Sequence, residues 1–139
     1  MDDRLLFLLS KAQFKLTNHL KLQFKAQGIS ISPGQMGILF LLEQQDLRSM
    51  SELSSILEID NSAITRLVDR LEKSGLVRRE SNPADRRQYL IGITGKGMQQ
   101  TLEAKKISNA VNDKIREGFS DHEISVFQRV MASFDHKFV

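Results

Sequence analysis

Helix-starting signals constrain the fold of this 139-residue chain more than any other feature. In a capping box, a Ser side chain and a Glu or Gln three residues later each bond the other residue's backbone N–H. Such boxes occur at Ser32–Gln35, Ser49–Glu52 and Ser120–Glu123. Pro33 takes the favoured first helical position of the first box, and Asp60 is a further good N-cap. Gly28 and Gly75 end two of the helical patterns.

These signals, together with apolar residues at helical spacing, predict a mainly α-helical chain with one β-hairpin. The predicted helices cover about residues 3–27, 33–42, 50–57, 61–74, 94–118 and 121–138. The start of the fifth is weakly marked, because Gly95 and Gly97 are poor helix formers. Short β-branched segments at 76–80 and 88–93 surround turn residues at 81–85, which predicts the hairpin between the fourth and fifth helices.

Composition excludes several classes of protein. The length suits one domain. Cys is absent, so disulfides, thiolate metal sites and thiol chemistry are excluded. The longest apolar run, at residues 5–9, is too short for a membrane span and lacks the flanks of a secretory signal. We therefore expect a soluble, cytoplasmic protein with no membrane partner.

Positive charge gathers in one part of the chain. Residues 61–90 hold seven positive side chains, six Arg and Lys73. The planar fork of Arg binds phosphates and base edges, so Arg clustering favours nucleic acid as a partner. A solvated basic face is the alternative interpretation.

The predicted helices at 50–57 and 61–74 are joined by only three residues, as in a helix-turn-helix. The second helix carries an apolar stripe at positions i, i+3, i+4 and i+7: Ile64, Leu67, Val68 and Leu71. A DNA recognition helix needs such a buried back, small residues near its N-terminus and Arg or Ser/Thr facing outward. The pattern predicts that residues 61–74 enter the major groove. A plain amphipathic surface helix is the alternative.

The residues predicted to contact DNA from this helix lie outside the apolar stripe. They are Ser62, Ala63, Thr65, Arg66 and Arg70. Asp69 is discordant on this face, because phosphates repel a carboxylate. Asp69 would either accept a hydrogen bond from a cytosine N4 or orient Arg66 or Arg70.

The hairpin next to the recognition helix indicates a winged helix-turn-helix. Its tip, the wing at residues 80–88, carries Arg86 and Arg87, which we predict to contact DNA at the narrow minor groove. Asp85 lies two positions before Arg87 and is predicted to orient that side chain through an ion pair.

Motifs in the central part of the chain resemble the multiple-antibiotic-resistance regulator (MarR) family of bacterial transcription factors. The resemblance covers about residues 30–97. It is carried by Ser32–Gln35 with Ile38-Leu39, by Ser51-Glu52-Leu53, by the run 64–79, and by Asn82–Arg87 followed by Ile91–Thr94 and Gly97. The family's Asp-x-Arg wing is present, and Ile93 stands where the family has Leu.

The resemblance implies a sequence-specific DNA-binding regulator, a ligand-responsive repressor that binds a palindromic operator as a homodimer. Residues 1–139 would form one domain, with the DNA-binding lobe at 30–95 and dimerisation helices at 1–28 and 96–139. Apolar residues on the last helix agree with a dimer: Ile124, Phe127, Val130, Met131 and Phe134. A monomer that folds these helices onto its own core is the alternative.

The resemblance also implies a small aromatic or phenolic effector, held between the dimer helices and the DNA-binding lobe. Most of the eight Phe must instead serve the core and the dimer interface. No set of residues indicates an enzyme, a cofactor or a metal site. His19, His122 and His136 lack partners at metal-ligand spacing. A winged helix that binds protein instead of DNA remains the second class, and the Arg-rich face and wing tip argue against it.

Overall fold

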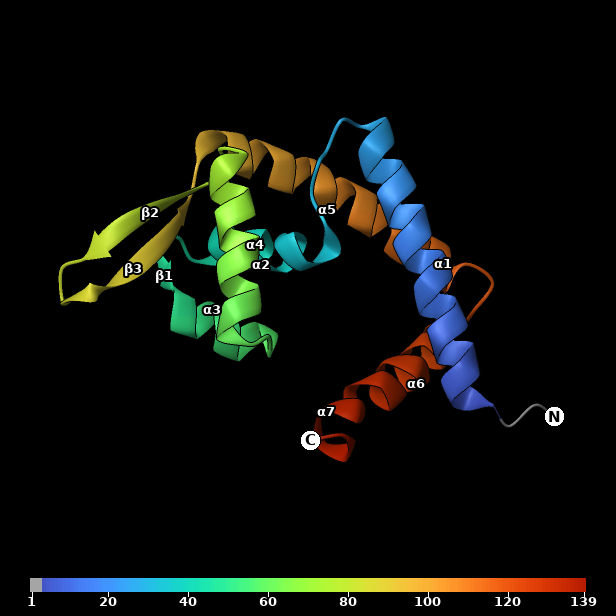
Figure 1. The fold of residues 1–139 in the computed structure, drawn as a ribbon. Coiled ribbons are helices and arrows are strands. Elements are labelled where there is room, and N and C mark those ends of the chain that lie inside the picture. Colours follow the sequence, from blue (N-terminus) through green and yellow to red (C-terminus); the bar gives the residue numbers. More distant parts are fainter. Residues whose placement is uncertain (1–3) are drawn as a thin grey trace. The chain divides into compact units, whose positions relative to one another are not determined.

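The computed structural model describes residues 4–139 and confirms a mainly helical fold with a small antiparallel sheet (Figure 1). The predicted order of four helices, a hairpin and further helices is present. The elements are α1 (Leu5–Ala26), α2 (Pro33–Gln44), β1 (Arg48–Ser49), α3 (Met50–Leu57), α4 (Asn61–Lys73), β2 (Val77–Asn82), β3 (Asp85–Ile93), α5 (Gly95–Arg116), α6 (Asp121–Ala132) and α7 (Phe134–Lys137).

Two of the three predicted capping boxes form completely. Ser32 and Gln35 exchange both bonds at the start of α2, and Ser120 and Glu123 do the same at the start of α6. The third box is only half formed, because the Glu52 N–H donates to Ser49 Oγ at 3.1 Å while the Glu52 carboxylate lies near the Ser49 hydroxyl instead of the backbone. Local sequence therefore sets these three helix starts.

The sheet and the last helix differ from the sequence prediction. Both strands of the hairpin are longer than predicted: β2 continues to Asn82, and β3 already begins at Asp85. The turn is confined to two residues, because Asn82 Oδ1 accepts the Ala84 N–H at 3.0 Å. β1 was not predicted. It is two residues long and pairs Arg48 with Ile91 of β3, a contact that only the tertiary fold provides.

The last predicted helix, 121–138, is divided into α6 and α7 at Ser133. The Ser133 hydroxyl donates to the Val130 carbonyl at 2.6 Å. Such back-bonding of Ser to its own helix competes with the regular backbone ladder. A run of good apolar spacing gives no sign of this break.

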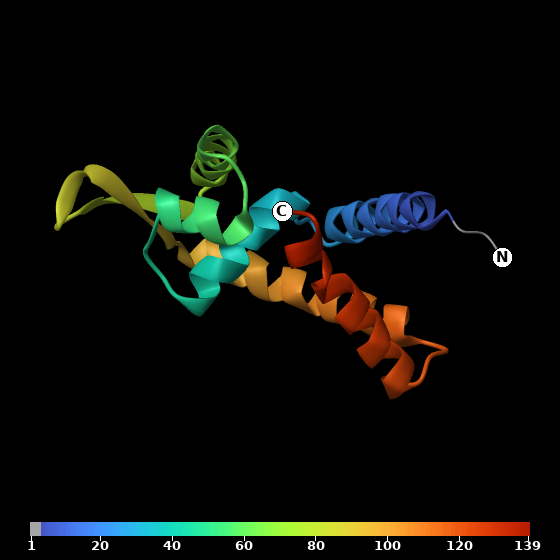
Figure 2. The ribbon, with the colours of Figure 1, turned by 90° about the horizontal axis from the view of Figure 1, so that it is seen from below.

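The chain divides into two compact units, residues 1–107 and residues 108–139. Within the first unit, α2, α3 and α4 pack on one another and on the base of the hairpin. Each of these elements contributes fully buried side chains, among them Ile38, Leu39, Leu42, Leu53, Ile64, Val68, Leu71 and Ile91. The hairpin of β2 and β3 projects away from these helices in both views (Figures 1 and 2). Its tip is therefore free to reach a partner.

The start of α5 is fixed by a cap and by a close approach to Leu76, the residue before β2. Thr94 is an N-cap that the sequence pattern did not single out: its Oγ1 accepts the Gly97 N–H at 3.0 Å and its hydroxyl donates to the Gly75 carbonyl at 2.6 Å. A Cβ atom at Gly97 would lie 2.0 Å from the Leu76 carbonyl oxygen. The helix can reach the Leu76 backbone this closely only because residue 97 has no side chain.

We expect Gly97→Ala to destabilise the protein by about 1–3 kcal/mol, because the methyl group has no room against a backbone carbonyl. Urea unfolding followed by circular dichroism measures this loss. Gly95→Ala is the matched control, since nothing lies within 4 Å of a Cβ there. That change should stabilise α5 by about 0.5–1 kcal/mol. Equal effects of the two substitutions would contradict the close approach.

Candidate nucleic-acid interface

α4 lies with one face in the core and the other in solvent. The predicted stripe is confirmed: Ile64, Val68 and Leu71 are buried, and Leu67 is half-buried. A Cβ at Gly34, near the start of α2, would touch Leu67 at 3.4 Å, so α2 packs closely against α4. Since the stripe fixes the rotation of the helix, the polar residues between its members must face outward.

The N-terminus of α4 is held by local hydrogen bonds. Asp60 accepts the Ser62 hydroxyl at 2.6 Å and the Ala63 N–H at 2.8 Å. The Thr65 hydroxyl donates to the Asn61 carbonyl at 2.8 Å. The bond from Ser62, followed by that from Ala63, lowers the pKa of Asp60 from its ordinary value. Ser62 and Thr65 thus keep an exposed oxygen while their hydroxyl protons are used within the helix start.

The outward arginines of α4 are exposed to solvent. Arg66 and Arg70 make no salt bridge with any residue from 4 to 139. One of the two roles expected for Asp69, orienting Arg66 or Arg70, is not found in the described part of the chain. Asp69 pairs instead with Arg79 of β2, which Glu72 also approaches at 3.6 Å. The discordant carboxylate on this face is therefore largely neutralised from within.

The wing tip carries two exposed arginines. The Arg87 side chain is 91% exposed, and Asp85 Oδ1 accepts the Arg87 backbone N–H at 3.1 Å and lies 3.4 Å from Arg87 Nε. Arg86 is exposed and makes no salt bridge within the described residues. Asp85 is thus placed to restrict the Arg87 side chain without covering it.

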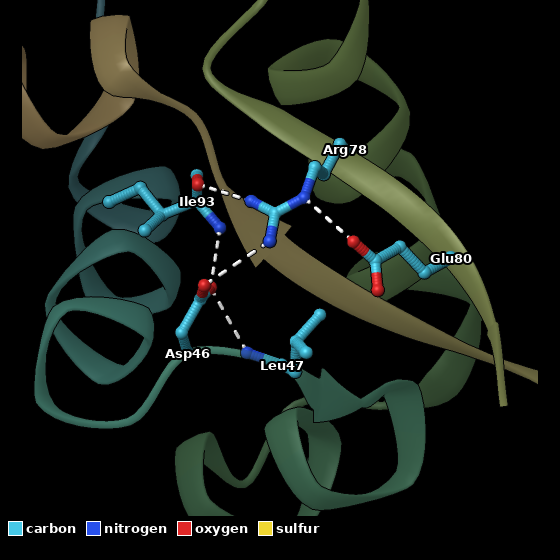
Figure 3. A network of polar contacts seen from close by, with 5 residues as sticks. All are labelled: Asp46, Leu47, Arg78, Glu80 and Ile93. Atoms are coloured by element: carbon cyan, nitrogen blue, oxygen red, sulfur yellow. Dashed lines mark hydrogen bonds and ion pairs between the residues drawn. The ribbon is translucent and has the colours of Figure 1, made fainter. Parts of the chain in front are cut away.

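A polar network anchors the base of the wing (Figure 3). Arg78 of β2 donates to the Ile93 carbonyl, to Asp46 at 3.2 Å and to Glu80 at 3.0 Å. Asp46 accepts the Ile93 N–H at 2.8 Å and the Leu47 N–H at 3.1 Å. The loop after α2 is thereby tied to both strands of the hairpin. This network leaves no pattern in the sequence, because its members lie far apart along the chain.

The same network shifts two pKa values. Partial burial raises the pKa of Asp46, but hydrogen bonds from the Ile93 N–H and from Arg78 outweigh this, so the pKa is lowered overall. The pKa of Arg78 is raised, chiefly by its bond to Glu80 and then by its bond to Asp46. Both shifts favour the charged forms, so the network is an ion pair at neutral pH.

The structure therefore sorts the seven cations of residues 61–90 into two groups. Arg78 and Arg79 are held by carboxylates at the base of the wing. The others face solvent on α4 or at the wing tip: Arg66, Arg70, Lys73, Arg86 and Arg87. Within residues 4–139, no three His, Cys, Asp or Glu side chains gather as a metal ion would need. None of the described helices is long and apolar enough to cross a membrane.

A helix-turn-helix whose second helix has a basic outer face, followed by a basic hairpin, defines the class of winged-helix DNA-binding proteins. A profile of the MarR family matches residues 31–89. A Bacillus subtilis relative, the uncharacterized helix-turn-helix-type transcriptional regulator YsmB, is 31% identical over 109 residues, which span 78% of this chain and 74% of YsmB. The chain belongs to the MarR family of transcriptional regulators.

Other relatives agree with this assignment. The Escherichia coli transcriptional regulator PapX is 32% identical over 77% of this chain and 63% of its own length. A MarR-family regulator from Rhodococcus sp. RHA1 is 26% identical with a TM-score of 0.80, covering 97% of this chain and 94% of that one. Across five curated relatives the match spans 42% to 74% of the relative's length.

Two structures with DNA share the fold at lower identity. The repressor CouR, bound to a 23-mer duplex, has a TM-score of 0.85 at 24% identity and covers 95% of this chain and 92% of its own. A mutant MarR from E. coli, complexed with operator DNA, has a TM-score of 0.84 at 21% identity over 94% and 93%. The fold of this chain is thus one that binds duplex DNA in other proteins.

We expect Asp46→Asn to destabilise the protein by about 0.2–1 kcal/mol at pH 7, the usual range for an exposed ion pair. The folded pKa of Asp46 is lowered, so its contribution is present above the unfolded value near pH 4 and is lost as pH falls through the lower folded value. The gap between wild type and variant should therefore close below about pH 4.

Thermal unfolding at pH 7, 5 and 3 measures this gap. Glu80→Gln is the control, because it removes the other carboxylate on Arg78 but leaves the negative charge that accepts the Ile93 and Leu47 N–H groups. It should cost less than Asp46→Asn. A gap between Asp46→Asn and wild type that does not change with pH would contradict the ionic role of Asp46.

Proposed function

We propose that this protein is a transcriptional repressor that binds a palindromic operator as a homodimer and leaves it when a small molecule binds. One observation carries the DNA-binding part of the proposal. The cations on the outer face of α4 and Arg86 on the wing make no salt bridge within the described residues, whereas the arginines at the base of the wing are paired. Exposed arginines without an ion-pair partner in the chain favour an anionic partner.

The two basic elements suit the two grooves of DNA. α4, predicted as residues 61–74, would lie in the major groove. Its contacts would be Ser62, Ala63, Thr65, Arg66 and Arg70. Small residues at its N-terminus let the backbone approach the base edges. The wing, residues 80–88, would lie along the backbone and place Arg86 and Arg87 at the minor groove, with Asp85 orienting Arg87.

The terminal helices are proposed to form the dimer. They comprise residues 1–28 and 96–139, which precede and follow the DNA-binding lobe at 30–95. Large apolar side chains are exposed on α1, among them Leu6 at 79% and Phe14 at 69%. α6 exposes Phe127 and Val130 at 49% each. Single exposed apolar residues are ordinary, but groups on helix faces mark surfaces that bury against a partner. A second copy would cover them on both helices.

Ligand response is proposed as reversible binding of a small aromatic or phenolic molecule that changes the spacing of the two DNA-binding lobes. Thiol oxidation is unavailable as a trigger, because the chain has no Cys. The resemblance to the family supports an aromatic or phenolic effector. If the protein represses transcription, its release from the operator switches the gene on.

Selection of fragments of the source genome on the purified protein tests the proposal. Enriched fragments should share an inverted repeat whose half-sites are centred roughly one helical turn, about 10 bp, apart. Affinity should fall steeply with salt as counterions are released. No enrichment, or a footprint on one asymmetric half-site, would contradict the proposal, and binding to protein alone would favour an interaction module.

We expect Arg87→Ala to cost about 1–3 kcal/mol of binding on the selected operator. The loss should be greater when the DNA under the wing is A·T-rich, because a narrow minor groove concentrates negative potential. Fluorescence anisotropy on paired operators with A·T-rich and G·C-rich flanks at fixed salt measures both quantities.

Two variants serve as controls for that test. Arg87→Lys keeps the charge but loses the planar fork, so it should recover only part of the affinity. Asp85→Ala should show a partial Arg87 defect if Asp85 holds that side chain, and tighter binding if its charge merely repels phosphate. Unchanged affinity of Arg87→Ala on every operator would remove the wing from the interface.

We expect light scattering to give twice the 15.8 kDa chain mass at micromolar concentration. Phe127→Glu should shift the protein toward the single-chain mass, because it places a charge in a buried apolar interface at little cost to the lone chain. Gln128→Glu adds the same charge at the next, also exposed, position and should leave the dimer intact. A single-chain mass for the unaltered protein over a wide concentration range would contradict the dimer.

A further inference from the structure

A basic cavity of about 580 Å³ lies beside the C-terminal half of α4, within the first unit. Its cations come from two helices that are distant in sequence: Lys21 and Lys25 near the end of α1, and Arg70 and Lys73 of α4. Ser30 and Ser32, from the loop and the N-cap between α1 and α2, line it as well. No Asp or Glu is among its lining residues.

The four cations are arranged to act together and are not neutralised within the chain. Lys21 and Lys25 are four residues apart, and Arg70 and Lys73 are three apart, so each pair lies on one face of its helix. All four side chains are exposed, and none makes a salt bridge with a residue of the described chain. Like charges repel, so such a group favours an anion between its members.

The walls of the cavity favour a phosphate group over an aromatic anion. The apolar residues of the loop, Ile29 and Ile31, are only 4% and 6% exposed, because they belong to the core. The exposed lining side chains that a ligand can contact are the serines and the four cations. Sites for aromatic molecules are mostly apolar and bury most of their ligand. A wide hollow with four cations and no carboxylate in its lining suits a group that is itself solvated, as a backbone phosphate is.

We infer that this cavity binds backbone phosphates of the DNA next to the half-site that α4 reads. The inference rests on the proposed function. A recognition helix contacts bases mainly through its N-terminal residues, so its C-terminal half lies at the rim of the groove, where the phosphates pass. Arg70 and Lys73 are in that half of α4. Lys21 and Lys25 then extend the contact to α1, which makes the first helix part of the DNA-binding surface.

This placement gives Arg70 a more specific role, because an Arg side chain can bind either a base edge or a phosphate. Its position in the cavity assigns it to phosphate. Contacts to phosphate fix the position of a protein on DNA and carry no sequence information. The cavity should therefore add affinity and salt dependence without changing the preferred sequence.

The test compares Lys21→Gln/Lys25→Gln with the unaltered protein on two duplexes, the selected operator with long flanks and the same operator cut back to its half-sites. On the long duplex the variant should lose on the order of 10-fold in affinity. The salt slope, which is the steepness with which the logarithm of the binding constant falls with the logarithm of the salt concentration, should be lower by about 1–2. On the short duplex the two proteins should bind alike. The ranking of operator sequences should not change.

Lys106→Gln/Lys114→Gln is the matched control. It removes two exposed lysines of α5 that are not among the residues lining the cavity, and it should leave the slope unchanged. Thermal melting and light scattering check that both double variants fold and dimerise like the parent. If the control lowers the slope as much as Lys21→Gln/Lys25→Gln does, the effect is one of net charge and the inference fails.

The remaining outcomes separate this inference from the proposed function. If the unaltered protein binds no duplex, both fall. If it binds and the cavity variant keeps its affinity and salt slope, only this inference falls. Inorganic phosphate, titrated at fixed ionic strength by thermal shift, tests a free anion as the occupant. Saturable sub-millimolar binding that Lys21→Gln/Lys25→Gln abolishes, with unchanged DNA affinity, would overturn the assignment to DNA.

Discussion

Burial of one face of α4 is the constraint on which the rest of the candidate site depends. Ile64, Val68 and Leu71 are completely buried among α2, α3 and the hairpin base. Removing three large aliphatic side chains from water stabilises the fold by several kcal/mol, at about 1.5–3 kcal/mol each. That sum outweighs any preference of the outer residues. The rotation of the helix, and with it the direction of Arg66 and Arg70, is therefore set by packing.

Ion pairing decides which arginines are available to a partner. Arg78 and Arg79 occupy neighbouring positions on β2, where one meets Asp46 and Glu80 and the other meets Asp69 and Glu72. These pairs tie the wing to the loop after α2 and to α4. They also remove acidic charge from the surface that faces outward. The same ion pairs therefore stabilise the base of the wing and leave fewer unpaired carboxylates beside the exposed cations.

The start of α5 links the same region to the following helix. Gly97 lets the backbone come against Leu76, and Thr94 bonds both the new helix and the Gly75 carbonyl at the end of α4. The wing strands, the end of α4 and the start of α5 therefore share one set of contacts. The polar groups at this junction are satisfied by one another, as buried or half-buried backbone groups require.

The sequence by itself determined the element order, the buried stripe of α4 and the family, because capping residues, helical periodicity and the motifs at residues 30–97 are local properties. It also placed Asp85 close enough to Arg87 for the ion pair that the structure contains. Only the tertiary structure decided the rest. β1 exists because β3 lies beside it, and Arg78 is structural because Asp46, far away in sequence, reaches it. Lys21 and Lys25 join Arg70 and Lys73 because folding brings the end of α1 to α4. Contacts between distant residues leave no periodic trace in either segment, so these features could not be derived from the sequence.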